Sequence, residues 1–230
     1  MACLIPLAFT LFIIYTQANA INKVPGEFVI DNLVGPWSSL LLGILVIILS
    51  YIVTEEEQQK NMLNLYRSYK SNWYGWIVKK SFVVIWILLC IFLINLMLNA
   101  IIIQIVEGMI ADSKGFASLY SLFLTKFSKA YIFVLPCLFF QLLLSVLIKK
   151  PVLPIMLGLF IMILGVPIAN LSDTYLIPYS YPILSQKPSI NILGLSLAGI
   201  LIIISCIIAI ILLLSGGKNH VAQAASISKD

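Results

Sequence analysis

The densest group of acidic side chains in this sequence is Glu55, Glu56 and Glu57, and adjacent carboxylates are candidates for acid–base or metal chemistry. No histidine or cysteine lies beside them, because the single histidine is His220 and the four cysteines fall within apolar runs. The chain contains no H-E-x-x-H, G-x-S-x-G or G-x-x-x-x-G-K-[ST] motif. We therefore expect no enzyme, no cofactor or metal bound by this chain, and no P-loop ATP hydrolysis.

The same glutamates open an amphipathic island, residues 54–80, in a chain that is 61% hydrophobic. Thr54 and Glu57 match the S/T-x-x-E capping box, which predicts that a new helix begins at Thr54. Apolar side chains then form a stripe at helical spacing, with Asn61 and Arg67 lying away from it: Met62, Leu65, Tyr66, Tyr69 and Trp73. This pattern predicts either a helix lying on the membrane surface or a short helix docked into a partner protein.

A second set of candidates consists of polar side chains inside apolar runs. Asn95 and Asn99 are four residues apart and would share one helix face, and Gln141 lies in a later run. Such amides favour hydrogen bonds between membrane helices, and the alternative is that they line a substrate path. Tyr179 and Tyr181 would join that path from the aromatic, proline-broken stretch 174–184. This stretch predicts either an aromatic belt with an interfacial turn or an outer lid.

The elements that position these residues follow from the mean hydropathy of +1.08 and the charged fraction of only 10%. About 20 mostly apolar residues cross a bilayer as a helix. We predict an all-α polytopic membrane protein with about six transmembrane helices, at 1–20, 34–53, 81–105, 129–148, 152–171 and 192–214. Pro36 and Trp37 are expected at the outer edge of the second span, and residues 106–128 are expected as a semi-polar connection. The first run ends in Ala18-Asn19-Ala20, as signal peptides do, but no lysine precedes Lys23, so we expect a retained span.

Six spans place both termini on one side of the membrane, and the positive-inside rule selects which side. With the termini inside, nine of the 14 basic residues are cytoplasmic: Lys60, Arg67, Lys70, Lys79, Lys80, Lys149, Lys150, Lys218 and Lys229. The other five, which lie outside, are Lys23, Lys114, Lys126, Lys129 and Lys187. We therefore expect cytoplasmic termini and a cytoplasmic island. The net charge of +5 fits this bias in the loops, and we expect no nucleic-acid partner.

The acidic start, the amphipathic Asn-containing segment and the basic return into a long third span resemble the loop between spans two and three of type-2 ATP-binding-cassette (ABC-2) permeases. The segment "LFFQLLLSVLIKKPVLPIMLGLFIMILG" and the motif "IPYSYPIL" are similar to the later spans of small permeases in bacterial lantibiotic-immunity and antimicrobial-peptide exporters. The resemblance covers most of the chain. It implies one ABC-2 transmembrane domain over 1–217, with a short flexible cytoplasmic tail at 218–230, in a bacterial plasma membrane.

What the resemblance implies for function is a membrane subunit that expels amphipathic antimicrobial peptides. Its partners would be cytoplasmic ATPase subunits holding ATP and Mg, a second identical or similar permease, and membrane lipid. The ATPase-coupling residues would be Glu55, Glu56, Glu57, Asn61, Met62, Leu65, Tyr66 and Tyr69. Two alternatives stay open: an ABC-2 permease for another lipid-like or hydrophobic cargo, and a non-transporting membrane anchor or sensor subunit.

Overall fold

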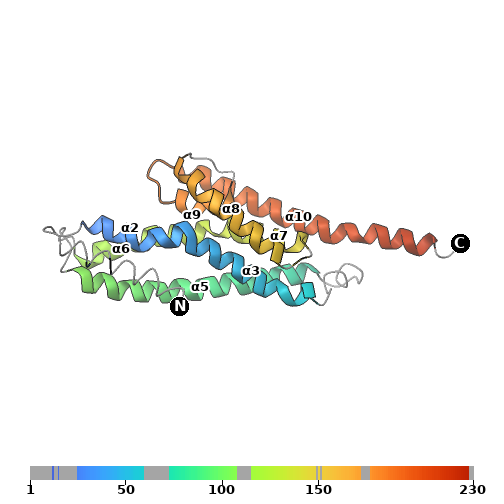
Figure 1. Cartoon of the computed structure of the whole chain (residues 1–230), viewed down its shortest axis with the longest axis horizontal. Coiled ribbons are helices and arrows are strands. Elements are labelled where there is room, and N and C mark those ends of the chain that lie inside the picture. The colour runs from blue at the N-terminus through green and yellow to red at the C-terminus, as the bar shows by residue number, and fades with distance from the viewer. Residues whose placement is uncertain are drawn as a thin grey trace.

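The protein is a bundle of helices in a computed structural model that describes residues 12, 15, 25–59, 73–107, 115–148, 150, 152–171 and 177–227 (Figure 1). Its long elements are α2 (Gly26–Pro36), α3 (Leu42–Gln59), α5 (Trp73–Val106), α6 (Phe116–Phe133), α7 (Leu135–Leu147), α8 (Val152–Leu171) and α10 (Ile192–Ile227). Three short ones are the π-helix η1 (Trp37–Leu41), the 3-10 helix η3 (Pro178–Ser180) and α9 (Tyr181–Leu184). The described residues form no strand.

Within these residues, five helical runs are long and apolar enough to cross a membrane. They are Gly26–Glu55, Lys79–Ile105, Phe116–Leu147, Val152–Ala169 and Ile192–Ile210. The prediction of an all-helical, multi-pass membrane protein is confirmed. Apart from Phe12 and Tyr15, the first predicted span lies outside the described residues, as does 60–72 of the island.

The described helices begin and end toward the two ends of the bundle. The ends of α3, α7 and α10 and the starts of α5 and α8 lie toward one end, which we name the island end (Figure 1). The starts of α2 and α6 and the ends of α5 and α8 lie toward the other, which we name the opposite end. Helices α2, α5 and α6 extend past α8 and α10 at the opposite end (Figure 1).

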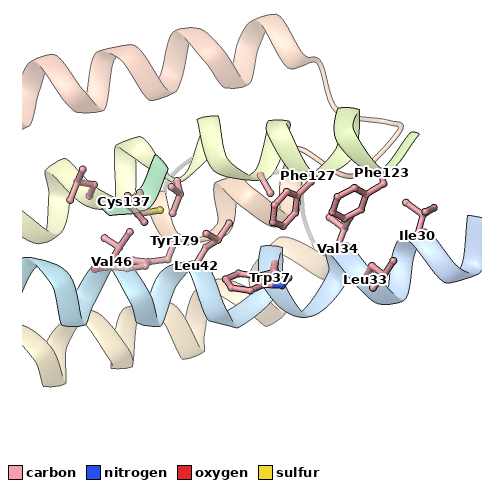
Figure 2. Close-up of a cluster of buried hydrophobic side chains, with 14 of the residues drawn as sticks. Ile30, Leu33, Val34, Trp37, Leu42, Val46, Phe123, Phe127, Cys137 and Tyr179 are labelled. Carbon is pink, nitrogen blue, oxygen red and sulfur yellow. The ribbon is translucent and has the colours of Figure 1, made fainter. Parts of the chain in front are cut away.

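The predicted edge of the second span is wrong. Helical structure continues from Gly26 to Gln59, and Trp37 is only 1% exposed in the middle of it. The indole packs edge-on against Phe127 of α6, with ring centroids 6.1 Å apart, and Figure 2 shows both rings inside the apolar cluster. The π-turn that follows Pro36 inserts an extra residue into the helix, so the chain passes the proline without ending it.

A helix start at Thr54 is also wrong. α3 runs through to Gln59, and the Thr54 hydroxyl donates a 2.8 Å hydrogen bond back to the Ser50 carbonyl. Threonine inside a helix makes this i−4 bond, whereas a capping threonine accepts a bond from a backbone N–H further along the chain. Glu55 to Glu57 therefore occupy the last turns of the helix that leaves the bundle.

The fourth span begins earlier than predicted, because residues 116–128 are helical and not a connection. α6 starts at Phe116 and leads into α7 through a single non-helical residue, Val134, giving one run to Leu147. Its buried face carries Phe123 and Phe127, whose rings stack with centroids 4.9 Å apart and pack against α2 and α5. Lys126, which made this stretch look polar, is partly buried and pairs with Asp31 of α2.

Candidate functional site

The segment between α8 and α10 is the most unusual part of the interior. Its two short helices, η3 and α9, pack against α6, α7 and α8. Tyr179 is 2% exposed and Tyr181 is fully buried, as are Ser180 and Leu184. The interpretation of these tyrosines as a belt at the membrane surface is therefore wrong. The two short helices bring aromatic and polar side chains into the interior of the bundle.

Gln141 of α7 is the centre of a buried polar cluster, which we name the Gln141 cluster. Its side-chain amide donates a 3.0 Å hydrogen bond to the Pro154 carbonyl of α8, and its Oε1 accepts a bond from the Tyr179 hydroxyl. One turn earlier on α7, the Cys137 thiol donates to the Pro178 carbonyl at 2.8 Å. Side-chain hydrogen bonds thus join α7 to α8 and to η3. In an apolar setting each of these bonds also satisfies a group that would otherwise be costly to bury.

Two glycines on one face of α8 make room for this cluster. A Cβ at Gly158 would lie 2.5 Å from Oε1 of Gln141, and a Cβ at Gly165 would lie 3.0 Å from Cγ2 of Ile177. They are seven residues apart and so share a helix face. Small residues allow close approach between membrane elements, and here they admit a glutamine side chain and the start of η3.

Asn95 and Asn99 are fully buried on α5, on the face that also carries Phe92. Phe92 stacks on Phe127 with centroids 5.5 Å apart, so this face is turned toward α6. The two amides donate to the carbonyls of Ile91 and Asn95, at 2.9 and 2.8 Å. In the described part of the chain, Oδ1 of Asn99 is buried without a hydrogen-bond partner. The prediction of a shared face is confirmed.

The five residues predicted to line a substrate path occupy three separate places. Gln141 and Tyr179 are bonded to each other, and the two asparagines lie on α5. Tyr181 packs in a second apolar cluster with Phe133, Leu184 and Leu195. Three pockets of the described residues are lined by other side chains. In this conformation all five residues are buried in packed interior, and their place on a path stays a prediction.

Two of those pockets are apolar openings on the sides of the bundle. One, of about 320 Å³, lies between α5 and α6–α7 and is lined by Leu89, Phe92 and Ile132 among others. Another, of about 400 Å³, lies between α7, α8 and α10, with Pro178 and Cys206 in its lining. The third, of about 360 Å³, is polar and lies between α2 and α6.

The sequence reasoning missed this polar pocket because residues 106–128 were expected to be a connection. Its lining includes Glu27, Ser118, Ser121 and Thr125. The three hydroxyl residues follow i, i+3 and i+7 spacing, which was the available signal of a polar stripe on a helix. Close by, Lys126 of α6 forms an ion pair with Asp31 of α2, with Nζ and Oδ1 2.5 Å apart. The pairing partner of this lysine lies 95 residues away in sequence, beyond any local pattern.

The predicted coupling residues fall at the island end. Glu55 is half-buried in α3, and the backbone of Glu56 and Glu57 continues that helix. The remaining five residues of the set lie outside the described residues: Asn61, Met62, Leu65, Tyr66 and Tyr69. The structure fixes where their segment begins and ends, because α3 leaves the bundle and α5 enters it at the same end (Figure 1).

Comparison with known proteins adds no relative to this description. No protein-family model, no curated protein and no solved structure matches the chain. What the molecule itself provides is a multi-pass helical membrane protein with a buried amide–tyrosine cluster, a polar pocket at the opposite end and an amphipathic connection at the island end.

Proposed function

We propose that this chain is the membrane-spanning permease subunit of an ATP-driven ABC-2 type exporter. Its cargo would be an amphipathic antimicrobial peptide, and ATP hydrolysis would take place on a separate ATPase polypeptide. A second permease, identical or similar, would complete the transporter in a bacterial plasma membrane. The coupling contact would be made by the island, residues 54–80.

The observation that carries this proposal is the placement of the island in the bundle. The ends of α3, α7 and α10 and the starts of α5 and α8 lie toward one end (Figure 1), and the sequence at and between these helix ends holds nine of the 14 basic residues. By the positive-inside rule that end is cytoplasmic. An acidic, aromatic segment held between two membrane helices on that side is suited to docking on a soluble ATPase.

The ion pair of Lys126 supports this orientation further. With the island end in the cytoplasm, Lys126 and Lys129 are among the five basic residues on the outer side. They therefore reduce the excess of basic residues on the cytoplasmic side. Lys126 is paired with Asp31, so the two charges balance locally. The basic residues at the island end therefore indicate the orientation more strongly than those at the opposite end do.

The helices and the island restrict the identity of the cargo less than they restrict the architecture of the protein. Export of another lipid-like or hydrophobic compound would use the same helices and the same island. A non-transporting anchor or sensor subunit would share the helices but would need no coupling between ATP hydrolysis and a conformational change. Protection of cells against an added antimicrobial peptide, compared with and without the ATPase, separates export from these alternatives.

The direct experiment is purification of the tagged chain from its native host, followed by identification of co-purifying proteins and an ATPase assay. We expect an ABC ATPase to co-purify and to hydrolyse ATP in the complex, while the chain alone hydrolyses none. Tyr66→Ala, in the middle of the apolar stripe, should reduce co-purification by about tenfold or more, because a central aromatic anchor contributes ~2 kcal/mol or more to an interface. Tyr74→Ala is the matched control, since Tyr74 lies outside that stripe. Equal ATPase recovery from Tyr66→Ala and wild type would remove the coupling role.

A further inference from the structure

The apolar pocket of about 400 Å³ between α7, α8 and α10 follows from how these three helices pack, and we name it the α8–α10 slot. α7 packs against both α8 and α10, whereas among the described residues α8 and α10 scarcely contact each other. Phe140 and Leu143 of α7 line the slot between them, and Ile161 lines it on α8. The lining residues of α10 are Ile202, Ser205, Cys206 and Ala209.

Ile177 and Pro178 complete the lining and close the slot toward the opposite end. Ile177 lies against α8, because a Cβ at Gly165 would be 3.0 Å from its Cγ2 atom. Pro178 is held to α7 by the 2.8 Å hydrogen bond that its carbonyl accepts from the Cys137 thiol. Both contacts lie about one turn closer to the opposite end than the lining residues of α7 and α8. A ligand in the slot would therefore contact the irregular segment that carries Tyr179.

The slot lies within the membrane-spanning part of both helices that flank it. The spans Val152–Ala169 and Ile192–Ile210 include all of the lining residues on α8 and α10. Large apolar side chains are exposed along both spans: Met156, Phe160, Ile163 and Leu164 on α8, and Leu197, Leu201, Ile204 and Ile208 on α10. The medium around these side chains is hydrocarbon, and apolar cavities much smaller than this slot, of about 150 Å³, already stay dry.

The depth of the slot corresponds to one half of the bilayer. On α10 the lining runs from Ile202 to Ala209, on the island side of the middle of the span Ile192–Ile210. Seven residues of α-helix cover about 10 Å, and one leaflet supplies about 15 Å of hydrocarbon. A ligand that enters from the leaflet at the island end would therefore end at Ile177 and Pro178, near the middle of the membrane.

We propose that the α8–α10 slot binds an acyl chain of a membrane phospholipid. An acyl chain ends near the middle of the bilayer by itself, whereas a transmembrane helix of a second chain would have to continue past the closed end. A peptide segment would also bring backbone N–H and C=O groups that need partners, and the lining side chains offer only the Ser205 hydroxyl and the Cys206 thiol. Since lipid tails are as apolar as leucine, the gain comes from van der Waals contacts with a lining that would otherwise face empty space. This site does not depend on the proposed export function.

The test uses the full chain in nanodiscs of phosphatidylcholine that carries a photoreactive diazirine near the end of one acyl chain. After irradiation, mass spectrometry of the digested protein locates the labelled residues. We expect label on Phe140 and Leu143, which are only partly exposed between α8 and α10. Label should also appear on Phe160 and Leu201, which face the surrounding lipid and serve as the internal reference.

Ala209→Phe places a phenyl ring in the slot and should lower the label on Phe140 and Leu143 by about tenfold relative to the reference, because the acyl chain loses many small contacts together. Ser205→Phe fills the slot one turn earlier on α10 and should act in the same way. Ile208→Phe is the matched control, since Ile208 is the next residue of α10 but is half-exposed and outside the lining. Its labelling pattern should equal that of wild type.

Two results would overturn the proposal. One is label on Phe160 and Leu201 of wild type with none on Phe140 or Leu143, or label on these two that both filling variants leave unchanged. The other comes from adding an amphipathic leucine–lysine peptide to the nanodiscs. If the peptide removes the label from Phe140 and Leu143 but not from the reference residues, the slot binds peptide in preference to lipid. Retention of the label supports the acyl chain.

Discussion

The Tyr179 hydroxyl donates a hydrogen bond to Oε1 of Gln141, although the two residues are 38 positions apart and both are buried. This bond ties the short helix η3 to the long helix α7. The Nε2 group of the same Gln141 amide donates a hydrogen bond to the Pro154 carbonyl of α8. The irregular segment between α8 and α10 is thus anchored by polar contacts as well as by its apolar surface, and this arrangement can be tested by substitution.

Tyr179→Phe should lower the free energy of unfolding by about 1 kcal/mol, in the upper part of the range for hydrogen bonds between membrane segments. The phenyl ring keeps the packing and loses only the donor. Tyr120→Phe is the control, because its hydroxyl is 3.5 Å from the Leu96 carbonyl and only partly buried, so its effect should be smaller. Unfolding in mixed micelles measures both. In a double-mutant cycle with Gln141→Leu, strictly additive losses would show that the two groups do not interact.

Gly158→Ala should destabilise the protein by about 2 kcal/mol, the usual cost of overpacking a filled interior. The new Cβ would lie 2.5 Å from Oε1 of Gln141 and 3.1 Å from Ile47, so the amide would have to move. Gly35→Ala makes the matched comparison, because nothing lies within 4 Å of its Cβ position inside α2. That change should be neutral or stabilising by up to about 1 kcal/mol through helix propensity. The same loss at both sites would contradict close packing at Gly158.

Asn99→Leu should leave stability unchanged or slightly raised. Oδ1 of Asn99 is buried without a partner in the described part of the chain, and its amide donates only within its own helix. Replacing such a group by an apolar one of similar size removes a desolvation cost. Gln141→Leu should instead lose about 2 kcal/mol, since it gives up two bonds to other elements. A large loss for Asn99→Leu would show that its amide has a binding partner that supports the fold.

Cysteine accessibility tests the orientation, on a background in which Cys3, Cys90, Cys137 and Cys206 are replaced. A membrane-impermeant maleimide added outside intact cells should label Ser189→Cys, which is exposed at the opposite end. Asn64→Cys in the island should react only after the cells are opened. Ser180→Cys should resist labelling from either side, because Ser180 is fully buried. Labelling of residue 64 and protection of residue 189 in intact cells would reverse the orientation and remove the proposed coupling role.

Much of the architecture follows from local sequence, because crossing a bilayer demands a long apolar helix and the chain supplies such runs. The predicted span 152–171 is α8 itself, and 81–105 lies within α5. The shared face of Asn95 and Asn99 follows from helical spacing alone. Hydropathy was also misleading at one place: Lys126 and its polar neighbours made residues 116–128 of α6 look like part of a connection. Lys126 can lie in a helix that packs against α2 because Asp31 of α2 pairs with it.

The sequence by itself determined that the chain is helical, spans the membrane several times and carries an amphipathic segment between two spans, since each of these is a property of neighbouring residues. Only the tertiary structure decided that Trp37 is interior, that Tyr179 and Tyr181 are buried, and that Lys126 meets Asp31. These facts depend on which helix faces approach each other, and two surfaces far apart in sequence leave no local pattern of their contact. The match of Thr54 and Glu57 to a capping box failed for the related reason that a short motif does not record whether the helix before it has already ended.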